Sequence, residues 1–154
     1  MSDINIVDYQ PHHQPYFEAF NRAWIEEIFE MEPVDIWVVT NPDKAILEPG
    51  GAILMAEYKG VPAGTVGLRK ADDKTFEFTK MAVSKNFRRL GIAEALSYAS
   101  FKKAKELGAD TVILYSNKLN AGAIKLYEKI GFKHVEVEPG VYKRANVKMV
   151  IDIS

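Results

Sequence analysis

The apolar positions along the chain recur at two spacings, and together they predict both helices and strands. Helical spacing over residues 14–31 predicts a long helix near the N-terminus, with an apolar stripe of Phe17, Phe20, Trp24, Ile28 and Met31. Residues 93–107 and 121–130 have the same spacing, and a glycine that favours a helix end follows each segment. Prolines and glycines interrupt residues 33–51, which we expect to form short helical turns and loop.

Segments rich in β-branched and aromatic residues predict a sheet around these helices. We expect strands at residues 4–9, 52–58, 61–70, 74–83, 111–116, 132–137 and 146–153. Lys59-Gly60 closes a hairpin between the second and third strands, and the second to fourth strands should be antiparallel. The fifth strand follows a helix, so it should return parallel to the fourth. The predicted fold class is α/β (α+β): a mixed, largely antiparallel sheet of about seven strands flanked by helices.

Composition sets limits on the function but does not identify the chemistry. The 154 residues, 47% of them hydrophobic, suit a single domain over residues 1–154 with a sizeable core. A net charge of −1 argues against a nucleic-acid partner. The absence of cysteine excludes disulfides and thiolate sites, and the histidine spacing predicts no metal. With no apolar signal or membrane-length run, we expect a cytoplasmic protein without a membrane partner, either monomer or homodimer.

The most informative stretch lies where the fourth strand gives way to a helix, and it reads Phe87-Arg88-Arg89-Leu90-Gly91-Ile92-Ala93. Cations at a helix N-terminus oppose the helix macrodipole, so Arg88 and Arg89 suit this place when an anion lies between them and the helix. Free backbone amides would bind a phosphate there, and Gly91 would let it approach the main chain. Two solvated arginines beside an ordinary helix start are the alternative interpretation.

A second motif predicts a helix with a polar face. Asn120 occupies the expected N-cap, Gly131 follows the last turn, and Phe132 can fold back on that turn. Asn120 and Tyr127 are seven residues apart, so they lie only about 20° apart around the helix axis, with Ala123 between them. One face therefore presents an amide, a small gap and a phenol. Taken singly, Asn120 is typical of a cap and Tyr127 of a core residue.

In this order and spacing, the two motifs resemble the GCN5-related N-acetyltransferase (GNAT) family, over most of the chain. Arg88, Gly91 and Ala93 match the family's Arg/Gln-x-x-Gly-x-Gly/Ala turn, which binds the pyrophosphate of acetyl-coenzyme A (acetyl-CoA). The resemblance implies acetyl-CoA as acyl donor and a GNAT-like sheet whose parallel fourth and fifth strands splay apart around the thioester arm. It implies a cofactor site made of Met81, Ala82, Val83, Arg88, Arg89, Leu90, Gly91, Ile92, Ala93, Asn120, Ala123 and Tyr127.

The resemblance also assigns chemical roles. An amine is cationic at neutral pH and must lose a proton before it attacks, so the reaction needs a base. Glu77, on the fourth strand where many family members place an acidic residue, is the candidate, with Glu57 and water as alternatives. A main-chain N–H of Ala82 or Val83 would stabilise the oxyanion. Tyr127 would protonate the leaving thiolate, and without a cysteine we expect direct transfer in a ternary complex.

The acceptor site is predicted from the last strand. Alternation over residues 142–149 places Arg144 and Asn146 on one face, together with Tyr142 and Lys148. A solvated face explains this pattern, but Arg144 could also bind a carboxylate with two hydrogen bonds and Asn146 could complete a polar pocket. We therefore expect a small-molecule amine, such as an amino acid, bound by Glu57, Arg144 and Asn146. An acidic run could favour a cationic acceptor, although a solvated helix face is the more usual interpretation, and three aromatics could line the acceptor pocket, although such residues more often lie in the core. These residues are Glu26, Glu27, Glu30, Glu32, Asp35, Trp24, Trp37 and Tyr58.

Other functions stay open on the sequence alone. A non-catalytic acyl-CoA sensor would keep Arg88, Gly91 and Asn120 but would not need Tyr127. An acetyltransferase of the same fold could instead modify a protein or peptide amine. A phosphotransferase is disfavoured because the chain has no Gly-x4-Gly-Lys-Ser/Thr loop.

Overall fold

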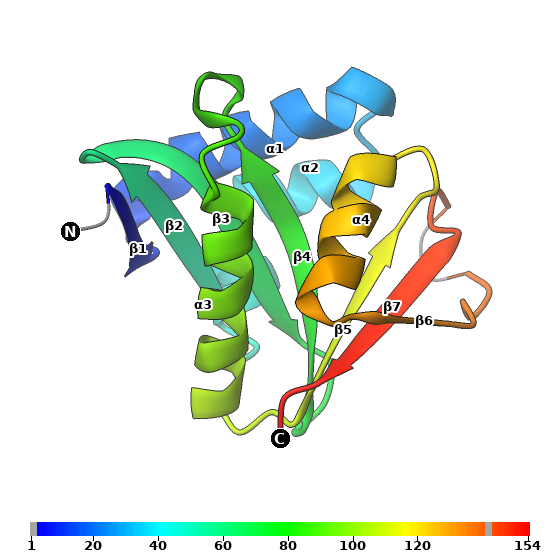
Figure 1. Ribbon diagram of the computed structural model, residues 1–154. Coiled ribbons are helices and arrows are strands. Elements are labelled where there is room, and N and C mark those ends of the chain that lie inside the picture. Colours follow the sequence, from blue (N-terminus) through cyan, green and yellow to red (C-terminus); the bar gives the residue numbers. More distant parts are fainter. Residues whose placement is uncertain (1–2, 141–142) are drawn as a thin grey trace.

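A mixed sheet of seven strands forms the centre of the computed structural model, which describes residues 3–140 and 143–154 (Figure 1). The strands are β1 (Ile4–Asp8), β2 (Ala52–Tyr58), β3 (Val61–Lys70), β4 (Thr75–Val83), β5 (Thr111–Ser116), β6 (Lys133–Val135) and β7 (Val147–Asp152). Their spatial order is β1-β2-β3-β4-β5-β7-β6. The β4–β5 pair is parallel and the other neighbouring pairs are antiparallel. The predicted fold class is confirmed.

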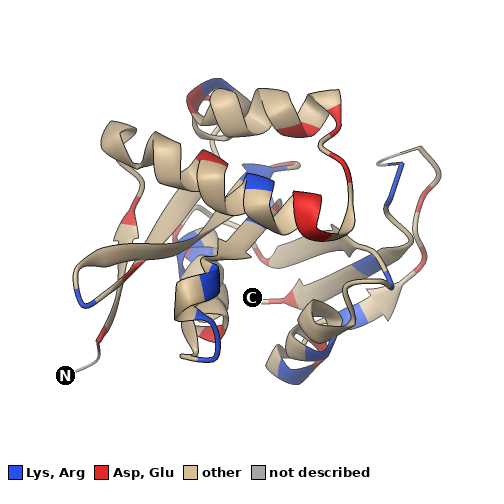
Figure 2. Cartoon of the chain, turned by 90° about the horizontal axis from the view of Figure 1, so that it is seen from above, with Lys and Arg blue, Asp and Glu red and all other residues tan. Residues whose placement is uncertain are grey.

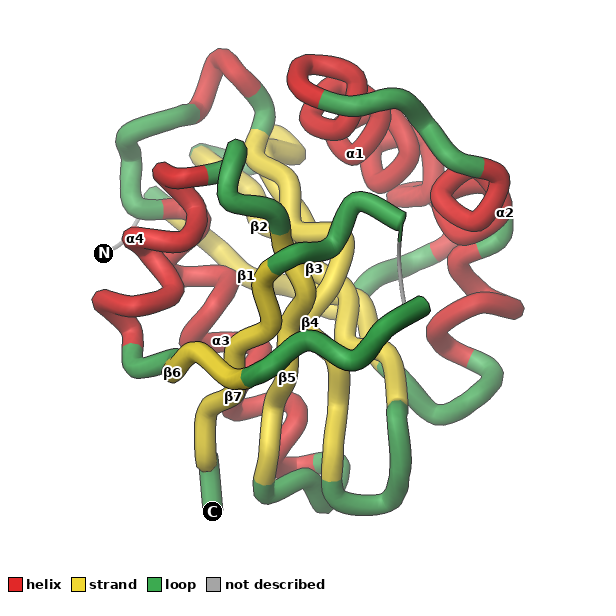
Figure 3. The backbone as a smooth tube through the Cα atoms, turned by 90° about the vertical axis from the view of Figure 1, so that its right-hand side faces the viewer, coloured by secondary structure: helices red, strands yellow, loops and turns green. Residues whose placement is uncertain are grey.

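Helices cover both faces of this sheet (Figure 3). One face carries α1 (Gln14–Ile28) and α2 (Pro33–Thr40), and the other carries α3 (Ile92–Glu106) and α4 (Ala121–Ile130). Short helical turns complete the chain: η1 (Pro11–His13), the π-helical η2 (Asp43–Leu47) and η3 (Lys85–Phe87).

The hydrophobic core is divided by the sheet into two clusters. In β2, Leu54 and Ala56 belong to the larger cluster, while Ile53 and Met55 belong to the smaller one. This alternation is the period of two expected of a strand with both faces covered. The smaller cluster includes Phe17 of α1 and Val39 of α2, and the larger includes Ile92 and Leu96 of α3 with Tyr127 and Ile130 of α4.

The parallel pair at the centre separates after three residues. Thr75, Phe76 and Glu77 of β4 pair with Thr111, Val112 and Ile113 of β5. Beyond Glu77, β4 continues to Val83 and β5 continues to Ser116 without pairing to each other. The predicted splay is therefore present, and it leaves backbone groups on one side of β4 without strand partners.

A bulge in β4 reinforces this separation. Gly67 of β3 pairs with Thr79 and Thr65 pairs with Ala82, so two residues of β4 lie opposite one residue of β3. Lys80, in the bulge, has a φ of 54°, in the left-handed region that few non-glycine residues adopt. Such a conformation re-aims the side chain, and Lys80 reaches across to Asp35 of α2.

Two of the sequence predictions need correction. The buried face of α1 is formed by Phe17, Asn21 and Ile25, whereas the predicted stripe residue Ile28 is 43% exposed. The final strand begins at Val147, so the alternation predicted over residues 142–149 does not apply to Arg144 and Asn146. These two residues lie in the segment before β7, where side-chain contacts replace a sheet ladder. Tyr142 lies outside the described residues.

Candidate functional site

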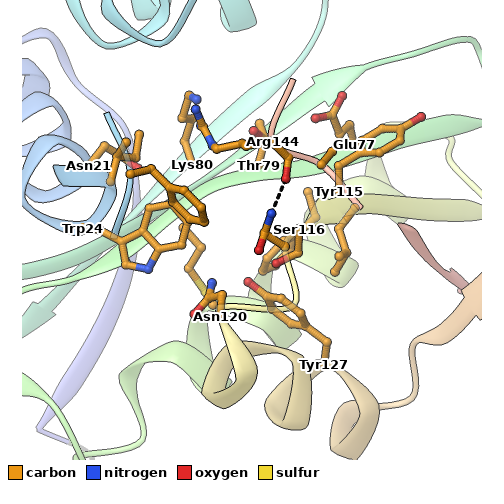
Figure 4. Close-up of a pocket in the computed structure, with 17 residues that line it drawn as sticks. Asn21, Trp24, Glu77, Thr79, Lys80, Tyr115, Ser116, Asn120, Tyr127 and Arg144 are labelled. Atoms are coloured by element: carbon orange, nitrogen blue, oxygen red, sulfur yellow. Dashed lines mark hydrogen bonds between the residues drawn. The ribbon is translucent and has the colours of Figure 1, made fainter. Parts of the chain in front are cut away.

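A pocket occupies the space that the splay opens between β4 and β5 (Figure 4). Its walls come from α1, the two separated strands, the start of α4 and the segment before β7. The residues that line it are Asn21, Trp24, Ile25, Phe29, Glu77, Phe78, Thr79, Lys80, Met81, Leu114, Tyr115, Ser116, Asn117, Asn120, Tyr127, Arg144 and Ala145. Of the predicted site residues, the splay gathers Glu77, Met81, Asn120, Tyr127 and Arg144 here.

An ionic cluster around the buried Asp35 forms one end of the pocket. Asp35, near the start of α2, is 1% exposed and lies 2.7 Å from Nζ of Lys80. Arg144 donates from Nη1 and Nη2 to the two carboxylate oxygens of Asp35, at 2.8 and 2.9 Å. Nη1 also donates to Glu32 at 2.8 Å. The cluster therefore contains two cations and two carboxylates, and its formal charges cancel.

Asp35 is held in its ionised form by this cluster. Burial acts to raise the pKa of the Asp35 carboxyl, but hydrogen bonds from Arg144 and Lys80 outweigh it and hold the pKa well below the usual range. One carboxylate oxygen also accepts the backbone N–H of Glu32 at 2.9 Å, which caps α2. The same carboxylate thus fixes the start of α2 to β4 and to the segment before β7.

The segment containing Arg144 bridges the two sides of the splay. Its guanidinium lies over the ring of Phe29, 5.6 Å from the centroid. On the other side, Nδ2 of Asn117 donates to the carbonyl oxygen of Arg144, as Figure 4 shows. The side chain thus binds the α1–α2 side and the backbone binds the end of β5, so Arg144 closes one wall of the pocket.

Tyr127 forms the opposite wall, on α4. Its ring packs edge-on against Phe78 and Phe132, with centroid distances of 5.6 and 5.9 Å. The contact with Phe132 confirms that this residue folds back on the last turn of α4, after Gly131 with its φ of 114°. Burial raises the pKa of the Tyr127 phenol, so the hydroxyl stays protonated at neutral pH.

Glu77 and Glu57, the two candidate bases, lie in different places. Glu77 lines the pocket, is 2% exposed, and accepts hydrogen bonds from Nε and Nη2 of Arg69 at 3.0 and 2.8 Å. Glu57 is on β2 beside the sheet edge, opposite Asn5 of β1, and does not line the pocket. Because β3 lies between β2 and β4 in the sheet order, Glu57 is a poor candidate for either catalysis or acceptor binding at this pocket.

The arginine-glycine turn leads into α3, as predicted. The helix begins at Ile92, and Gly91 occupies the N-cap with a φ of 84°. A Cβ added to Gly91 would meet no atom within 4 Å, so open space borders the main chain at the helix N-terminus. Arg88 and Arg89 are exposed beside it. Free amides of the first helical turn, a glycine without packing neighbours and two cations fit the pyrophosphate of acetyl-CoA.

Arg88 has an internal partner in this structure. Its Nη2 lies 3.0 Å from Oε2 of Glu27, at the C-terminal end of α1, and both side chains are more than 40% exposed. The hydrogen bond from Arg88 lowers the pKa of Glu27. Figure 2 shows acidic residues gathered at this end of α1 and along the segment leading to α2. Three of the five predicted acidic residues, Glu27, Glu32 and Asp35, form ion pairs with the protein's own cations and are not simply a solvated face.

The predicted acceptor residues are not all brought together. Arg144 lines the pocket, but the two parallel hydrogen bonds predicted for an acceptor carboxylate are made to Asp35. Asn146 lines a different groove, between α4 and the β6–β7 edge, where its Oδ1 accepts the backbone N–H of Lys118. A shared pocket for Arg144 and Asn146 was therefore wrong, because the chain turns between them to meet the end of β5.

Several other predictions are resolved at the same pocket. Trp24 lines it, whereas Trp37 is 49% exposed on α2 and Tyr58 packs on Phe87. Asn120 stands at the N-cap of α4 without a side-chain capping hydrogen bond, so its amide is available to the pocket. Sequence reasoning missed Asn21 and Lys80. Asn21 could have been found as the polar residue in the i, i+4, i+8 series with Phe17 and Ile25.

Comparison with known proteins gives consistent results for fold and family. A model of the acetyltransferase (GNAT) family matches residues 8–132. N-acetylaspartate synthetase of Homo sapiens is 34% identical over 121 residues, covering 78% of this chain and 38% of that protein. A crystal structure of a GNAT-family acetyltransferase from Staphylococcus aureus Mu50 has a TM-score of 0.87 at 21% identity, covering 98% of this chain and 99% of that chain. YncA of Salmonella typhimurium, solved with acetyl-CoA, has a TM-score of 0.73 at 16% identity, and the match covers 99% of this chain and 95% of that chain.

The chain spans only about a third of the length of the N-acetylaspartate synthetases it matches, from 29% to 38%. In the described part of the chain, no helix combines the length and apolar character that a membrane crossing requires. Over residues 3–140 and 143–154, no group of three or more His, Cys, Asp or Glu side chains is placed to bind a metal ion.

Proposed function

The chain belongs to the acetyltransferase (GNAT) family, and we propose that it transfers the acetyl group of acetyl-CoA to the primary amine of a small acceptor. The observation that carries this proposal is the pocket in the β4–β5 splay, which is lined both by the phenol of Tyr127 and by the buried carboxylate of Glu77. A helix N-terminus with room for a phosphate lies at the end of the same strand. This arrangement suits a long donor whose phosphates and reacting group must be bound in different places.

Acetyl-CoA would be bound through contacts along β4, α3 and α4. Arg88, Arg89 and the amides of residues 90–93 would bind the pyrophosphate, with Gly91 giving the closest approach. Met81, Ala82 and Val83 would border the thioester arm on the open side of β4, where pairing to β5 has ended. Asn120 and Ala123 on the first turns of α4 would line the other side of that arm.

Acetyl-CoA supplies an activated acetyl thioester, and this chain's residues move the protons. The ammonium releases one proton to solvent before it attacks as the neutral amine, and Glu77 accepts the second proton as the new C–N bond forms. A main-chain N–H at Ala82 or Val83 stabilises the charge that develops on the carbonyl oxygen. Tyr127 donates its proton to the sulfur as the C–S bond breaks, which its raised pKa permits by keeping the hydroxyl protonated at neutral pH.

We propose an acceptor that carries a carboxylate as well as an amine, such as an amino acid. Asp35 takes the end of the Arg144 guanidinium formed by Nη1 and Nη2, and Glu32 takes a further Nη1 proton. The Nε–Nη2 edge remains for another carboxylate, because no hydrogen bond joins Nε to a described residue. Similarity to a protein named N-acetylaspartate synthetase supports an acceptor of this type.

A coenzyme A release assay tests the proposed function. The protein is incubated with acetyl-CoA and separate amines: amino acids, simple alkylamines, a polyamine and a short peptide with a free N-terminus. The released thiol is read with a disulfide reagent, to which a cysteine-free protein adds no background. We expect turnover with small amines and fastest turnover with an amino acid. Fastest turnover on the peptide favours the protein-modifying alternative, and acetyl-CoA binding without any turnover favours the sensor.

The variant Arg144→Lys tests the carboxylate. Lysine keeps the charge but cannot make two parallel hydrogen bonds, so KM for an amino acid should rise while KM for an alkylamine stays unchanged. Equal effects on both acceptors would show that Arg144 only closes the pocket wall.

A further inference from the structure

One buried polar side chain in the pocket, Asn21, has an oxygen that the fold leaves without a partner. Asn21 lies in the buried face of α1, between Phe17 and Ile25, and is 1% exposed. Its neighbours on that face are apolar, so packing alone would favour leucine or isoleucine at this position. Asn21 also lines the pocket, on the α1 side beside Trp24 and across from Tyr127 and Asn120 (Figure 4).

The orientation of the Asn21 amide is fixed by the helix. Nδ2 donates to the carbonyl oxygen of Phe17 at 2.9 Å, and a flipped amide would bring two oxygens together there. Oδ1 is therefore directed away from that carbonyl. Among the buried side-chain nitrogen and oxygen atoms of the described residues, Oδ1 of Asn21 is the one without a hydrogen-bond partner.

An unpaired buried acceptor is uncommon, because it loses its hydrogen bonds to water and gains none in return. An amide oxygen can only accept, so the group that pairs with it must carry an N–H or O–H. The charged side chains at this end of the pocket, Lys80, Asp35 and Arg144, already bind one another. Asn21 thus offers a buried, unpaired acceptor to an incoming donor, and Asn120 offers its amide at the opposite side of the pocket.

We propose that Oδ1 of Asn21 accepts a hydrogen bond from the N–H of the acceptor amine and thereby orients its nitrogen toward the thioester. This role rests on the proposed function, because it concerns the second substrate of the same pocket. A neutral primary amine has two N–H groups, so it can give one proton to the base as the C–N bond forms and keep the other in the hydrogen bond to Asn21. A secondary amine has only the one N–H that it must give up. Asn21 therefore makes primary amines the preferred substrate class, and it contacts substrate without taking a proton.

The variant Asn21→Leu separates this role from a structural one. Leucine has nearly the same shape, fits the apolar face of α1, and removes the unpaired oxygen, so the melting temperature should stay equal or rise. In the coenzyme A release assay, kcat/KM for the best primary amine should fall at least tenfold, and KM for acetyl-CoA should not change. A residue with only a structural role would give the opposite result, a lower melting temperature and unchanged kinetics.

A binding measurement keeps the test independent of turnover. L-aspartate and n-butylamine serve as amine probes, and succinate serves as a probe with carboxylates but no amine; each is titrated by calorimetry in the presence of coenzyme A. Asn21→Leu should weaken the amine probes at least tenfold and leave succinate unchanged. Asn5→Leu is the matched control, because Asn5 is exposed on β1. It should change neither the affinity for the probes nor the turnover.

The outcomes are distinguishable. If the wild type turns over amines and Asn21→Leu is equally active, the role of Asn21 is wrong and the proposed function stands. If the wild type binds coenzyme A but no amine causes it to release the thiol from acetyl-CoA, the proposed function is wrong. In that case the Asn21 contact stands only if the amine probes bind the wild type and lose affinity in Asn21→Leu, and failure of the probes to bind overturns it.

Discussion

The two ends of the site are built in different ways. At the cofactor end, Arg88 and Gly91 are exposed and lie within four residues before the first turn of α3, where backbone geometry sets the site. At the acceptor end, the buried Asp35 binds Lys80, which is 45 positions away in the sequence, and Arg144, which is 109 positions away. A phosphate site made from local backbone can be recognised as a motif. A site made from distant side chains exists only after the chain has folded.

This difference also separates what each end contributes to stability. The Arg88–Glu27 pair lies in solvent, where ion pairs contribute only about 0–1 kcal/mol. Asp35 is buried and its partners are mostly buried, so removing Asp35 leaves Lys80 and Arg144 poorly solvated and without their shared carboxylate. The cofactor end can therefore be altered with small effects on folding, whereas the acceptor end supports both the pocket and the fold.

Tyr127→Phe should give the largest effect, because the phenol lies where the two ends meet. Without a proton for the leaving sulfur, kcat should fall by about 10²–10⁴ while affinity for acetyl-CoA stays unchanged. Steady-state kinetics and calorimetry measure the two quantities. Tyr98→Phe, at an exposed position of α3, controls for loss of a hydroxyl. Full turnover in Tyr127→Phe would remove Tyr127 as the acid.

Asp35→Asn should destabilise the fold, because Asp35 belongs to the ionic cluster at the acceptor end. The variant leaves Lys80 and Arg144 without their shared carboxylate, so the free energy of unfolding at pH 7 should drop by about 3–5 kcal/mol. Urea denaturation measures it. Glu18→Gln breaks a partly exposed pair with Arg22 and should lose no more than about 1 kcal/mol.

The pH dependence of that difference has a definite sign. The folded-state pKa of Asp35 is depressed, so its ionised form stabilises the fold above its unfolded pKa of about 3.9, and this stabilisation is lost as the pH falls through the folded value. The stability gap between the wild type and Asp35→Asn should be constant from pH 7 to about pH 5 and narrow only below about pH 4. A gap that closes between pH 7 and 5 would contradict the assignment to Asp35.

Gly91→Val should affect the cofactor end alone. The side chain would fill the open space at the helix N-terminus, so acetyl-CoA should bind more than about tenfold more weakly, a loss above about 1.4 kcal/mol. Because Gly91 has a positive φ, valine also strains the backbone. Gly108→Val is the matched control, since Gly108 has a φ of 99° and a Cβ added there would also meet no atom within 4 Å. Similar stability losses with weaker binding only in Gly91→Val would support the phosphate site.

Glu27→Gln should give the smallest effect and in the opposite direction. If Arg88 binds the pyrophosphate, Glu27 competes with it for Arg88, so neutralising Glu27 should strengthen acetyl-CoA binding by about two- to fivefold, a change of the size expected for an exposed ion pair. The gain should disappear at high salt, which screens the original pair. Glu26→Gln, one residue away, should not change the affinity. A weaker affinity in Glu27→Gln would mean that Glu27 orients Arg88 for the cofactor.

Most of the fold could be predicted from local patterns. The hairpin of β2 and β3, the bounds of β5 and the ends of α4 follow from alternation, turn glycines and helical spacing. The errors fell where long-range contacts replace local preference. The apolar stripe predicted for α1 did not include Asn21, which lies on the buried face. Arg144 was predicted in the last strand but lies before it, where its side chain binds Asp35.

The sequence by itself determined the family motif, the order of strands and helices, and the glycine turn at α3, because each depends on neighbouring residues and on backbone conformation. Only the tertiary structure decided that β4 and β5 separate after Glu77 and that Asp35 pairs with Lys80 and Arg144. It also decided that Oδ1 of Asn21 is left unpaired in the pocket. These features depend on which distant side chains meet in a desolvated space, where a charge or amide must find a partner or wait for a ligand.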